Sequence, residues 1–232
     1  MGILLPYLPL FDAAHRRGGI ASPFWVLGSQ QIVADGSLET WARERGYESM
    51  AREPTTANLF RDRYGLDEYT DFDLNDSAAV KLDLSAPLPD EWRGGAGTVL
   101  DSGTIEHVYD IRRVMENTHD MVRPGGTFIA LAPITWWEHG FVNLNPKFYR
   151  AFARANGYEP LVEGFNFTFK VPFLGQRYVN VLTRDGTPKP RAKLWVDRMM
   201  NRVQPALTLY FCCYRRTGSE PFREPSDIFD NW

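Results

Sequence analysis

The chain has 232 residues, of which 44% are hydrophobic and 24% charged, and its formal net charge is −3. A chain of this length can bury roughly 70–75% of its unfolded surface without disulfides or metals. The composition is typical of a globular protein and not of a disordered or fibrous one. The acidic balance argues against a nucleic-acid partner, which needs a broad basic surface. Aromatic residues make up 14% of the chain, and aromatic side chains line ligand pockets as well as cores.

The two cysteines, Cys212 and Cys213, are adjacent and poorly placed to bridge distant segments. This cysteine usage favours a reducing, cytoplasmic location. The apolar run from Ile3 to Phe11 contains two prolines and lacks a basic leader, so we expect neither a secretory signal nor a membrane span. Because the sequence has no internal repeat, we expect a single domain over residues 1–232.

Strand and helix signals alternate along most of the chain. In chain order they predict a helix over 10–17, a strand over 24–27, helices over 37–45 and 55–64, strands over 69–74, 79–84 and 98–100, a helix over 111–122, a strand over 127–132, a helix from 146, and strands over 165–171 and 207–214. A charged connection of about 35 residues joins the last two strands. The alternation predicts a parallel sheet with helices on both faces.

Ligands of such sheets bind beyond the carboxyl ends of the strands, so the residues that follow each strand are the candidates. Gly28, Ser29 and Gln30 follow the first strand. They form either an ordinary turn or one whose backbone and amide groups approach a cofactor. Neither G-x-G-x-x-G nor a P-loop is present, which counts against nicotinamide-dependent dehydrogenases and P-loop phosphotransferases.

Two carboxylates end the next strands. Asp73 ends the second strand and could accept hydrogen bonds from the vicinal hydroxyls of a ribose, since a carboxylate offers only acceptors. Asp76 competes for this role, and either residue could instead cap a turn. Asp83 ends the third strand and could accept from an adenine amino group, with Leu84 against the ring; the alternative is a solvated loop carboxylate.

Asp101 ends a buried strand, and Glu106 and His107 follow closely. His107 could act as a general base because an imidazole titrates near neutral pH, or it could only fix the start of a helix. His139 follows the fifth strand and faces the same cleft. Glu106, His107 and His139 are weak candidates for a metal site with two histidines and one carboxylate, and we expect pocket histidines without a metal instead.

Three stretches together resemble a known family: 72–75 followed by 82–89, then 99–108, and then 121–128 with its Arg-Pro-Gly-Gly turn. From Tyr69 to Gly157 the chain is similar to the core of the class I S-adenosylmethionine-dependent methyltransferases, in the group with a methyltransferase type 11-like domain. The resemblance implies a Rossmann-like, doubly wound seven-stranded sheet that is mostly parallel, with a C-terminal antiparallel hairpin. It also implies S-adenosylmethionine as the cofactor.

The resemblance assigns cofactor contacts by position. Asp73 and Leu74 would lie at the ribose, Asp83 and Leu84 at the adenine, and Asp101, Ser102 and Gly103 at the methionine part. The sequence departs from the family in the first loop, which is usually acidic and glycine-rich but here retains Gly28 alone. Some metal-dependent members carry E-x-x-E-H after the fourth strand. This chain matches that run in part, because Gly103 replaces the first acid.

We therefore expect a cytoplasmic methyltransferase that acts on a small-molecule acceptor, on an oxygen of a natural-product or sugar-like compound, with His107 or His139 as the base. One alternative is a cofactor-binding scaffold subunit with little activity. Another is a metal-dependent RNA ribose methyltransferase, against which the acidity argues.

Three segments are expected to shape the acceptor site. Trp136, Trp137 and Phe141 are candidates for the acceptor pocket, because aromatic residues gather in this part of the chain. The N-terminal helical extension, residues 1–22, would add to it. The insertion between the last two strands, residues 172–205, would also add to the acceptor site. It could close over an anionic acceptor, or it could instead remain solvated or form the interface of a homodimer.

Overall fold

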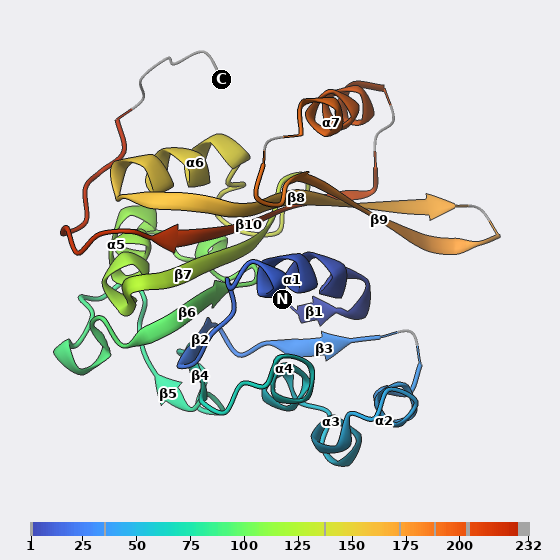
Figure 1. Ribbon diagram of the computed structural model, residues 1–232, viewed down its shortest axis with the longest axis horizontal. Helices are drawn as coiled ribbons and strands as arrows, with labels where there is room; N and C mark the ends of the chain where they lie inside the picture. The colour runs from blue at the N-terminus through green and yellow to red at the C-terminus, as the bar shows by residue number, and fades with distance from the viewer. Residues whose placement is uncertain are drawn as a thin grey trace.

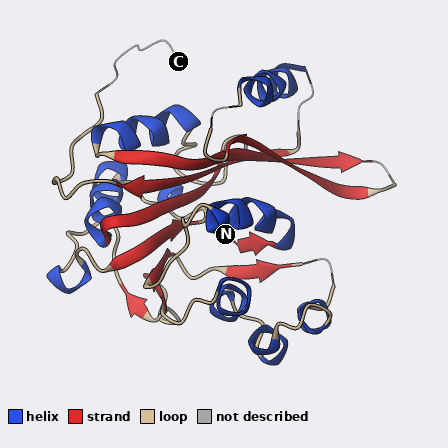
Figure 2. Cartoon of the chain, in the orientation of Figure 1, coloured by secondary structure: helices blue, strands red, loops and turns tan. Residues whose placement is uncertain are grey.

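Eight strands form the main sheet of the computed structural model, which describes residues 2–34, 36–136, 138–171, 173–187, 189–202 and 205–226 (Figures 1 and 2). Their order across the sheet is β5-β4-β2-β6-β7-β10-β8-β9. These strands are β2 (Phe24–Leu27), β4 (Tyr69–Asp73), β5 (Val80–Lys81), β6 (Ala96–Asp101), β7 (Val122–Pro133), β8 (Tyr158–Val171), β9 (Gly175–Arg184) and β10 (Leu207–Arg216). Two further short strands, β1 (Gly2–Leu4) and β3 (Gln31–Val33), pair in parallel beside it.

The five predicted helices are present, and the structure adds two α-helices, α3 and α7, and three short 3₁₀ helices. The helices are α1 (Leu8–Arg16), α2 (Leu38–Arg43), α3 (Glu48–Arg52), α4 (Thr56–Tyr64), α5 (Ile111–Met121), α6 (Pro146–Ala155) and α7 (Pro190–Arg202), together with the 3₁₀ helices η1 (Leu5–Tyr7), η2 (Asp90–Trp92) and η3 (Ile105–His107). Side-chain caps begin several of these helices. The Ser37 hydroxyl accepts a hydrogen bond from Thr40 N at the start of α2. The Asn145 amide oxygen accepts from Lys147 N at the start of α6, whose first residue is a proline.

The sheet has a parallel half and an antiparallel half. Strand β2 pairs in parallel with β4 on one side and with β6 on the other, and β6 pairs in parallel with β7. The chain runs outward from β2 through β4 to β5 and then returns to β6. The carboxyl ends of β2, β4 and β6 therefore meet at a switch point of the topology, where doubly wound sheets bind ligands.

Helices cover both faces of the sheet (Figure 1). Helices α5 and α6 pack on one face, and α1 and α4 pack on the other. Strand β7 reflects this two-sided burial, because Phe128 and Ala130 join the first core while Ile129 and Leu131 join the second. A strand buried on both faces reads as a continuous apolar run, which is why 127–132 was recognisable in the sequence.

The strand count corrects the sequence-based expectation. A seven-stranded sheet was implied, whereas the main sheet of the described residues has eight strands. The additional strand is β9, which lies in the segment expected to be a charged connection. Most β9 residues are exposed or half-buried, so no apolar pattern marks the strand in the sequence. The strand forms by antiparallel pairing with β8, in a register that runs from Glu163–Arg184 to Val171–Gly175.

Two smaller differences concern the antiparallel half and the third strand. The late strands do pair with each other, but β10 inserts between β7 and β8. The strand expected over 79–84 is reduced to β5, which covers Val80 and Lys81.

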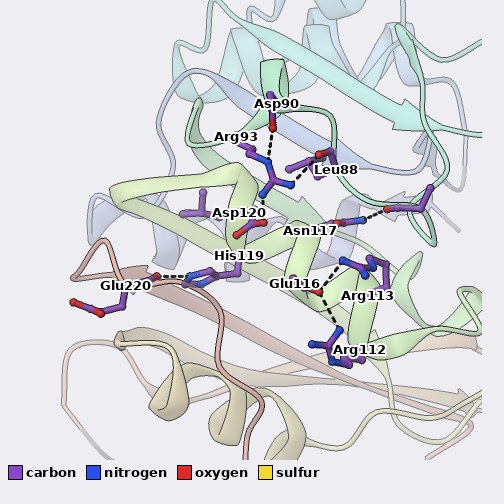
Figure 3. A network of polar contacts seen from close by, with 12 residues as sticks. Leu88, Asp90, Arg93, Arg112, Arg113, Glu116, Asn117, His119, Asp120 and Glu220 are labelled. Atoms are coloured by element: carbon purple, nitrogen blue, oxygen red, sulfur yellow. Dashed lines mark hydrogen bonds and ion pairs between the residues drawn. The ribbon is translucent and has the colours of Figure 1, made fainter.

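Polar side chains of α5 hold two loops in place (Figure 3). The Asn117 amide donates to the carbonyl oxygens of Leu84 and Ala86, at 2.9 and 2.8 Å, and so fixes the loop that carries Asp83. His119 Nε2 lies 2.9 Å from the carbonyl oxygen of Glu220. Because a carbonyl can only accept, this nitrogen carries the proton and ties the C-terminal segment to the helix.

Within the described ranges, no helix has the length and apolarity that a bilayer crossing requires.

Candidate functional site

The loop after β2 is joined to the end of β4. Gly28 N donates to the carbonyl oxygen of Phe72 at 2.7 Å. Ser29 N then donates to Asp73 Oδ2 at 2.8 Å, and the Ser29 hydroxyl donates to Asp71 Oδ2 at 2.6 Å. Parallel pairing of β2 with β4 brings these groups together, since paired parallel strands end at the same edge. The structure thus brings Gly28, Ser29 and Asp73 together, as the sequence analysis expected of one binding edge.

Thr104 closes the same loop from the side of β6, and sequence reasoning missed it. Its hydroxyl donates to the carbonyl oxygen of Leu27 at 2.7 Å, and the Gln30 side-chain amide donates to that same oxygen at 3.1 Å. Gly28 has φ +74°, and a Cβ there would lie 2.3 Å from Thr104 Oγ1. Glycine is therefore required at position 28 by both backbone conformation and space.

The other predicted cofactor residues lie in contrasting environments. Asp73 is half-buried, and its second oxygen accepts from Asn75 N at 3.2 Å; the neighbouring Leu74 is exposed. Asp83 is exposed, and hydrogen bonds from the Ser85 hydroxyl and backbone N–H lower its pKa. Leu84 is buried in the core beside α5.

At the end of β6, Asp101 is fully buried. One carboxylate oxygen, Oδ1, accepts from Thr104 N at 2.8 Å and Ile105 N at 3.2 Å and so caps η3. The other oxygen, Oδ2, and the Ser102 hydroxyl are buried and have no hydrogen-bond partner among the described residues. Burial raises the pKa of Asp101 to about 6. Gly103 makes the turn between Asp101 and η3 with φ +79°.

Glu106, His107 and His139 converge although they come from two loops. The Nε2 atoms of the two histidines lie 3.3 Å apart, and His139 Nε2 lies 3.3 Å from Glu106 Oε1. Burial, together with the charge of Asp101, raises the pKa of Glu106 to about 8. Burial lowers the pKa of both histidines, and for His139 the neighbouring His107 adds to the effect. Both imidazoles are therefore neutral at neutral pH.

The loop after β7 is seated tightly on η3. Phe141 N donates to the carbonyl oxygen of Glu106 at 2.8 Å, and a Cβ on Gly140 would lie 2.6 Å from that oxygen. The Trp136 ring stacks on the His139 ring, with centroids 4.0 Å apart and an interplanar angle of 12°. The Phe141 ring is exposed and packs edge-on against Tyr109. Trp137 lies outside the described residues.

Tyr149 on α6 contributes a further buried polar atom. Its hydroxyl has no hydrogen-bond partner among the described residues. Burial raises its pKa well above the usual range, and the charges of Asp101 and Glu106 add to the effect. Tyr149 lies in the helix predicted from residue 146, and no feature of the sequence pointed to this tyrosine as a site residue.

A cavity of about 610 Å³ adjoins these residues. It is lined by the N-terminal segment, the ends of β6, β7 and β10, and the paired strands β8 and β9, including Tyr7, Ser102, Leu131, Trp136, Lys170 and Tyr178. Its walls are mostly apolar and aromatic, with a few polar groups, which is the usual character of a small-molecule pocket. Of the aromatic residues expected at an acceptor pocket, Trp136 lines the cavity.

No protein-family model matches the sequence, and no curated protein matches it. Solved structures do match. A protein from Bacillus halodurans named as a methyltransferase superposes with a TM-score of 0.52 at 9% identity, covering 90% of this chain and 99% of that one. One from Galdieria sulphuraria, named as a sarcosine dimethylglycine methyltransferase, superposes with a TM-score of 0.50 at 12% identity, covering 90% and 84%.

The Burkholderia thailandensis 1,6-didemethyltoxoflavin-N1-methyltransferase, solved with S-adenosylhomocysteine, is a more distant match with a TM-score of 0.47 at 12% identity, covering 92% and 79%. The similarities to the first two structures define the fold as the Rossmann-like fold of the class I methyltransferases.

Proposed function

We propose that this protein transfers a methyl group from S-adenosylmethionine to a small-molecule acceptor. One observation carries the proposal. Asp101 Oδ2 and the Ser102 hydroxyl are buried at the carboxyl end of β6 without partners among the described residues, and Ser102 also lines the 610 Å³ cavity. Buried polar atoms are normally hydrogen-bonded, so an unpaired pair at this edge suits a ligand that brings donors. The ammonium group of the methionine part of the cofactor is such a donor.

The opposite end of the cofactor would lie at Asp73. Each of its oxygens accepts one backbone N–H, from Asn75 or Ser29, and an ionised carboxylate has about four acceptor positions. Asp73 can therefore also accept from two ribose hydroxyls. Asp83 and Leu74, both exposed at the neighbouring strand ends, stay predictions for the adenine and ribose contacts.

When bound, the cofactor supplies an electrophilic methyl group on a sulfonium. The chain's own residues would hold the acceptor in line with that methyl, exclude water and take up the acceptor's proton. The apolar walls of the cavity would orient the acceptor. Neutral His107 or His139 would accept a hydroxyl proton at an imidazole nitrogen, which favours an oxygen acceptor over other nucleophiles.

The cavity walls support an acceptor class. Aromatic surfaces from Tyr7, Trp136 and Tyr178 suit a flat, partly apolar molecule, and the exposed Lys170 at the wall suits one with an acidic or hydroxylated edge. A hydroxylated natural product meets both requirements.

Calorimetric titration with S-adenosylmethionine and S-adenosylhomocysteine tests the cofactor assignment. We expect one saturable site for each. If neither ligand gives a heat of binding, the cofactor assignment is wrong and the alternative, a scaffold subunit with a methyltransferase fold, is favoured. Once an acceptor is found by screening hydroxylated aromatic compounds for S-adenosylhomocysteine release, His107→Ala should lose turnover while its cofactor affinity stays unchanged.

A further inference from the structure

The side chains of Glu106, His107 and His139 place three metal-binding atoms around one point. One carboxylate oxygen and two imidazole nitrogens lie within 4.8 Å of one another. We propose that these three atoms bind a single divalent transition-metal ion, with Zn²⁺ as the best match, in a site that keeps one coordination position open.

The distances fit this ion. A tetrahedral zinc site with bonds of about 2.0–2.1 Å places neighbouring ligand atoms about 3.3–3.4 Å apart. The separation of the two histidine Nε2 atoms is 3.3 Å, and the separation of His139 Nε2 from Glu106 Oε1 is also 3.3 Å. Two imidazole nitrogens with one carboxylate favour a first-row transition metal over magnesium or calcium, which prefer oxygen ligands.

Hydrogen bonding within the cluster is the competing explanation, and it leaves atoms unsatisfied. A proton on His139 Nε2 can be donated to His107 or to Glu106 but not fully to both, and a proton on Glu106 Oε1 donated to His139 would still leave Oε2 without a partner. The Glu106 side chain is only 2% exposed, so both of its carboxylate oxygens are buried. Neither oxygen has a hydrogen-bond partner among the described residues. A cation at the point of convergence would satisfy the carboxylate and both nitrogen lone pairs at once.

The surroundings hold the ligands in position. The loop that carries His139 is fixed to η3 by the hydrogen bond from Phe141 N to the Glu106 carbonyl oxygen and by the close approach of Gly140. The Trp136 ring stacks on His139 and restricts its rotation. Supporting contacts of this kind orient metal ligands, and their loss typically reduces metal affinity about 10–100-fold.

Three protein ligands leave the fourth position for water or substrate, as in catalytic zinc sites. Trp136 contacts His139 and also lines the 610 Å³ cavity, so the ion would lie beside the proposed acceptor site. The proposal rests on the proposed function and refines it: the ligand class is an acceptor with a metal-binding hydroxyl, and with the ion bound His107 and His139 would hold the ion instead of accepting the proton themselves. That hydroxyl would lose its proton to solvent while bound to the ion, and its oxygen would keep the electron pair that attacks the methyl carbon. The methyl–sulfur bond would break at the same time, and its electron pair would stay on the sulfur of the departing S-adenosylhomocysteine.

Metal binding is tested directly on the full chain, independently of methyl transfer. Protein stripped with a chelator is titrated with Zn²⁺ in competition with a chromophoric indicator, and with Co²⁺ while the visible spectrum is recorded. We expect one ion per chain and the intense visible bands of a four-coordinate Co²⁺ site. Azide should change this spectrum by binding at the open position; an unchanged spectrum would contradict the open position.

Variants locate the ion. His107→Asn removes one histidine ligand, whose side chain is exposed, and His139→Asn removes the other; each should lower Zn²⁺ affinity by at least about 100-fold. His15→Asn, which alters an exposed histidine on α1, should bind like the wild type. Thermal melting of each apo variant checks that it is folded. No 1:1 binding to the wild type, or binding that survives both ligand substitutions, overturns the proposal even if S-adenosylmethionine binds normally.

Discussion

His107 and His139 face each other with their Nε2 atoms 3.3 Å apart, although 32 residues separate them in the chain. The parallel pairing of β6 with β7 explains the encounter, because η3 follows one strand and the Trp136–Phe141 loop follows the other. The hydrogen bond from Phe141 N to the Glu106 carbonyl then sets the final distance. The position of the His139 ring therefore depends on how closely this loop approaches η3.

Gly140→Ala should disturb that approach. Its Cβ would meet the Glu106 carbonyl oxygen at 2.6 Å, so the loop must move away and carry His139 with it. We expect Zn²⁺ affinity to fall about 10–100-fold, as for the loss of other supporting contacts. Indicator competition measures the change. Gly218→Ala is the matched control, because no atom lies closer than 4.0 Å to its Cβ position, and equal affinities of the two variants would contradict the prediction.

Asp73→Ala should weaken cofactor binding. The substitution removes the proposed acceptor of two ribose hydroxyls and also the anchor of Ser29 N. Two hydrogen bonds to a charged group are together worth about 3 kcal/mol, which corresponds to a loss of affinity of roughly 100-fold. Calorimetry with S-adenosylhomocysteine measures it. Asp76→Ala removes an exposed carboxylate whose partner is Lys81 and should leave the affinity unchanged.

Gly28→Ala should strain the loop after β2. The residue has φ +74°, and its Cβ would displace the Thr104 hydroxyl from the Leu27 carbonyl. We expect a loss of about 1–3 kcal/mol in the free energy of unfolding. Urea unfolding of the single variants and of Gly28→Ala/Thr104→Ala separates the two causes. The Thr104→Ala change should cost less in the alanine-28 background than alone, and strictly additive losses would exclude the steric cause.

Glu163 should make the protein sensitive to acid. Arg150 Nε donates to its Oε1 at 2.9 Å, and the Tyr210 and Tyr214 hydroxyls donate to the same oxygen at 2.8 and 2.7 Å. Burial acts to raise the pKa of Glu163, but Arg150 and the two hydroxyls outweigh burial and lower it below the usual range. The folded state then binds fewer protons than the unfolded state. Its stabilisation is complete above about pH 4.5 and is lost as the pH falls through the lower folded pKa.

Glu163→Gln should therefore lower the stability of the folded protein at neutral pH and make that stability less dependent on pH in the acidic range. Removing one partner of a buried ion pair costs about 3 kcal/mol, or roughly 6–12 °C in melting temperature for a chain of this size. Melting curves from pH 3 to pH 7 should become flatter below about pH 4.5 in the variant. The exposed Glu159→Gln on the same strand is the control, and a wild-type acid slope in Glu163→Gln would refute the assignment.

The parallel half of the sheet was predictable because its signals are local. Continuous apolar runs, capping residues and glycines after helices mark β2, β6 and α4, and each of these elements lies close to its predicted range. Strand β7 contains its predicted range, 127–132, but begins earlier, at Val122. The residues at the strand ends followed from the general rule for such sheets, so Asp73 and Asp101 could be named in advance.

The rest depends on distances that spacing does not encode. Glu106, His107 and His139 were weak metal candidates in the sequence, and strand pairing brings their ligand atoms within 4.8 Å of one another. Thr104 and Tyr149 act through packing against segments remote in sequence, and β9 is formed by pairing with β8 and not by its own pattern. Leu84, expected beside an adenine, is buried in the core, and the Asn117 amide donates to its carbonyl oxygen. Its adenine contact stays a prediction.

Strand β9 contributes to the walls of the proposed acceptor site and not to the proposed cofactor contacts. The proposed cofactor contacts come from loops of the parallel half, whereas Tyr178 on β9 and Tyr7 near the N-terminus wall the cavity. These walls could be exchanged for those of another protein without shifting the register of any parallel strand of the main sheet. Selectivity for the acceptor could then be redesigned by grafting residues 1–7 and 175–184 from another protein. The loops of the parallel half, which would bind the methyl donor, would stay unchanged.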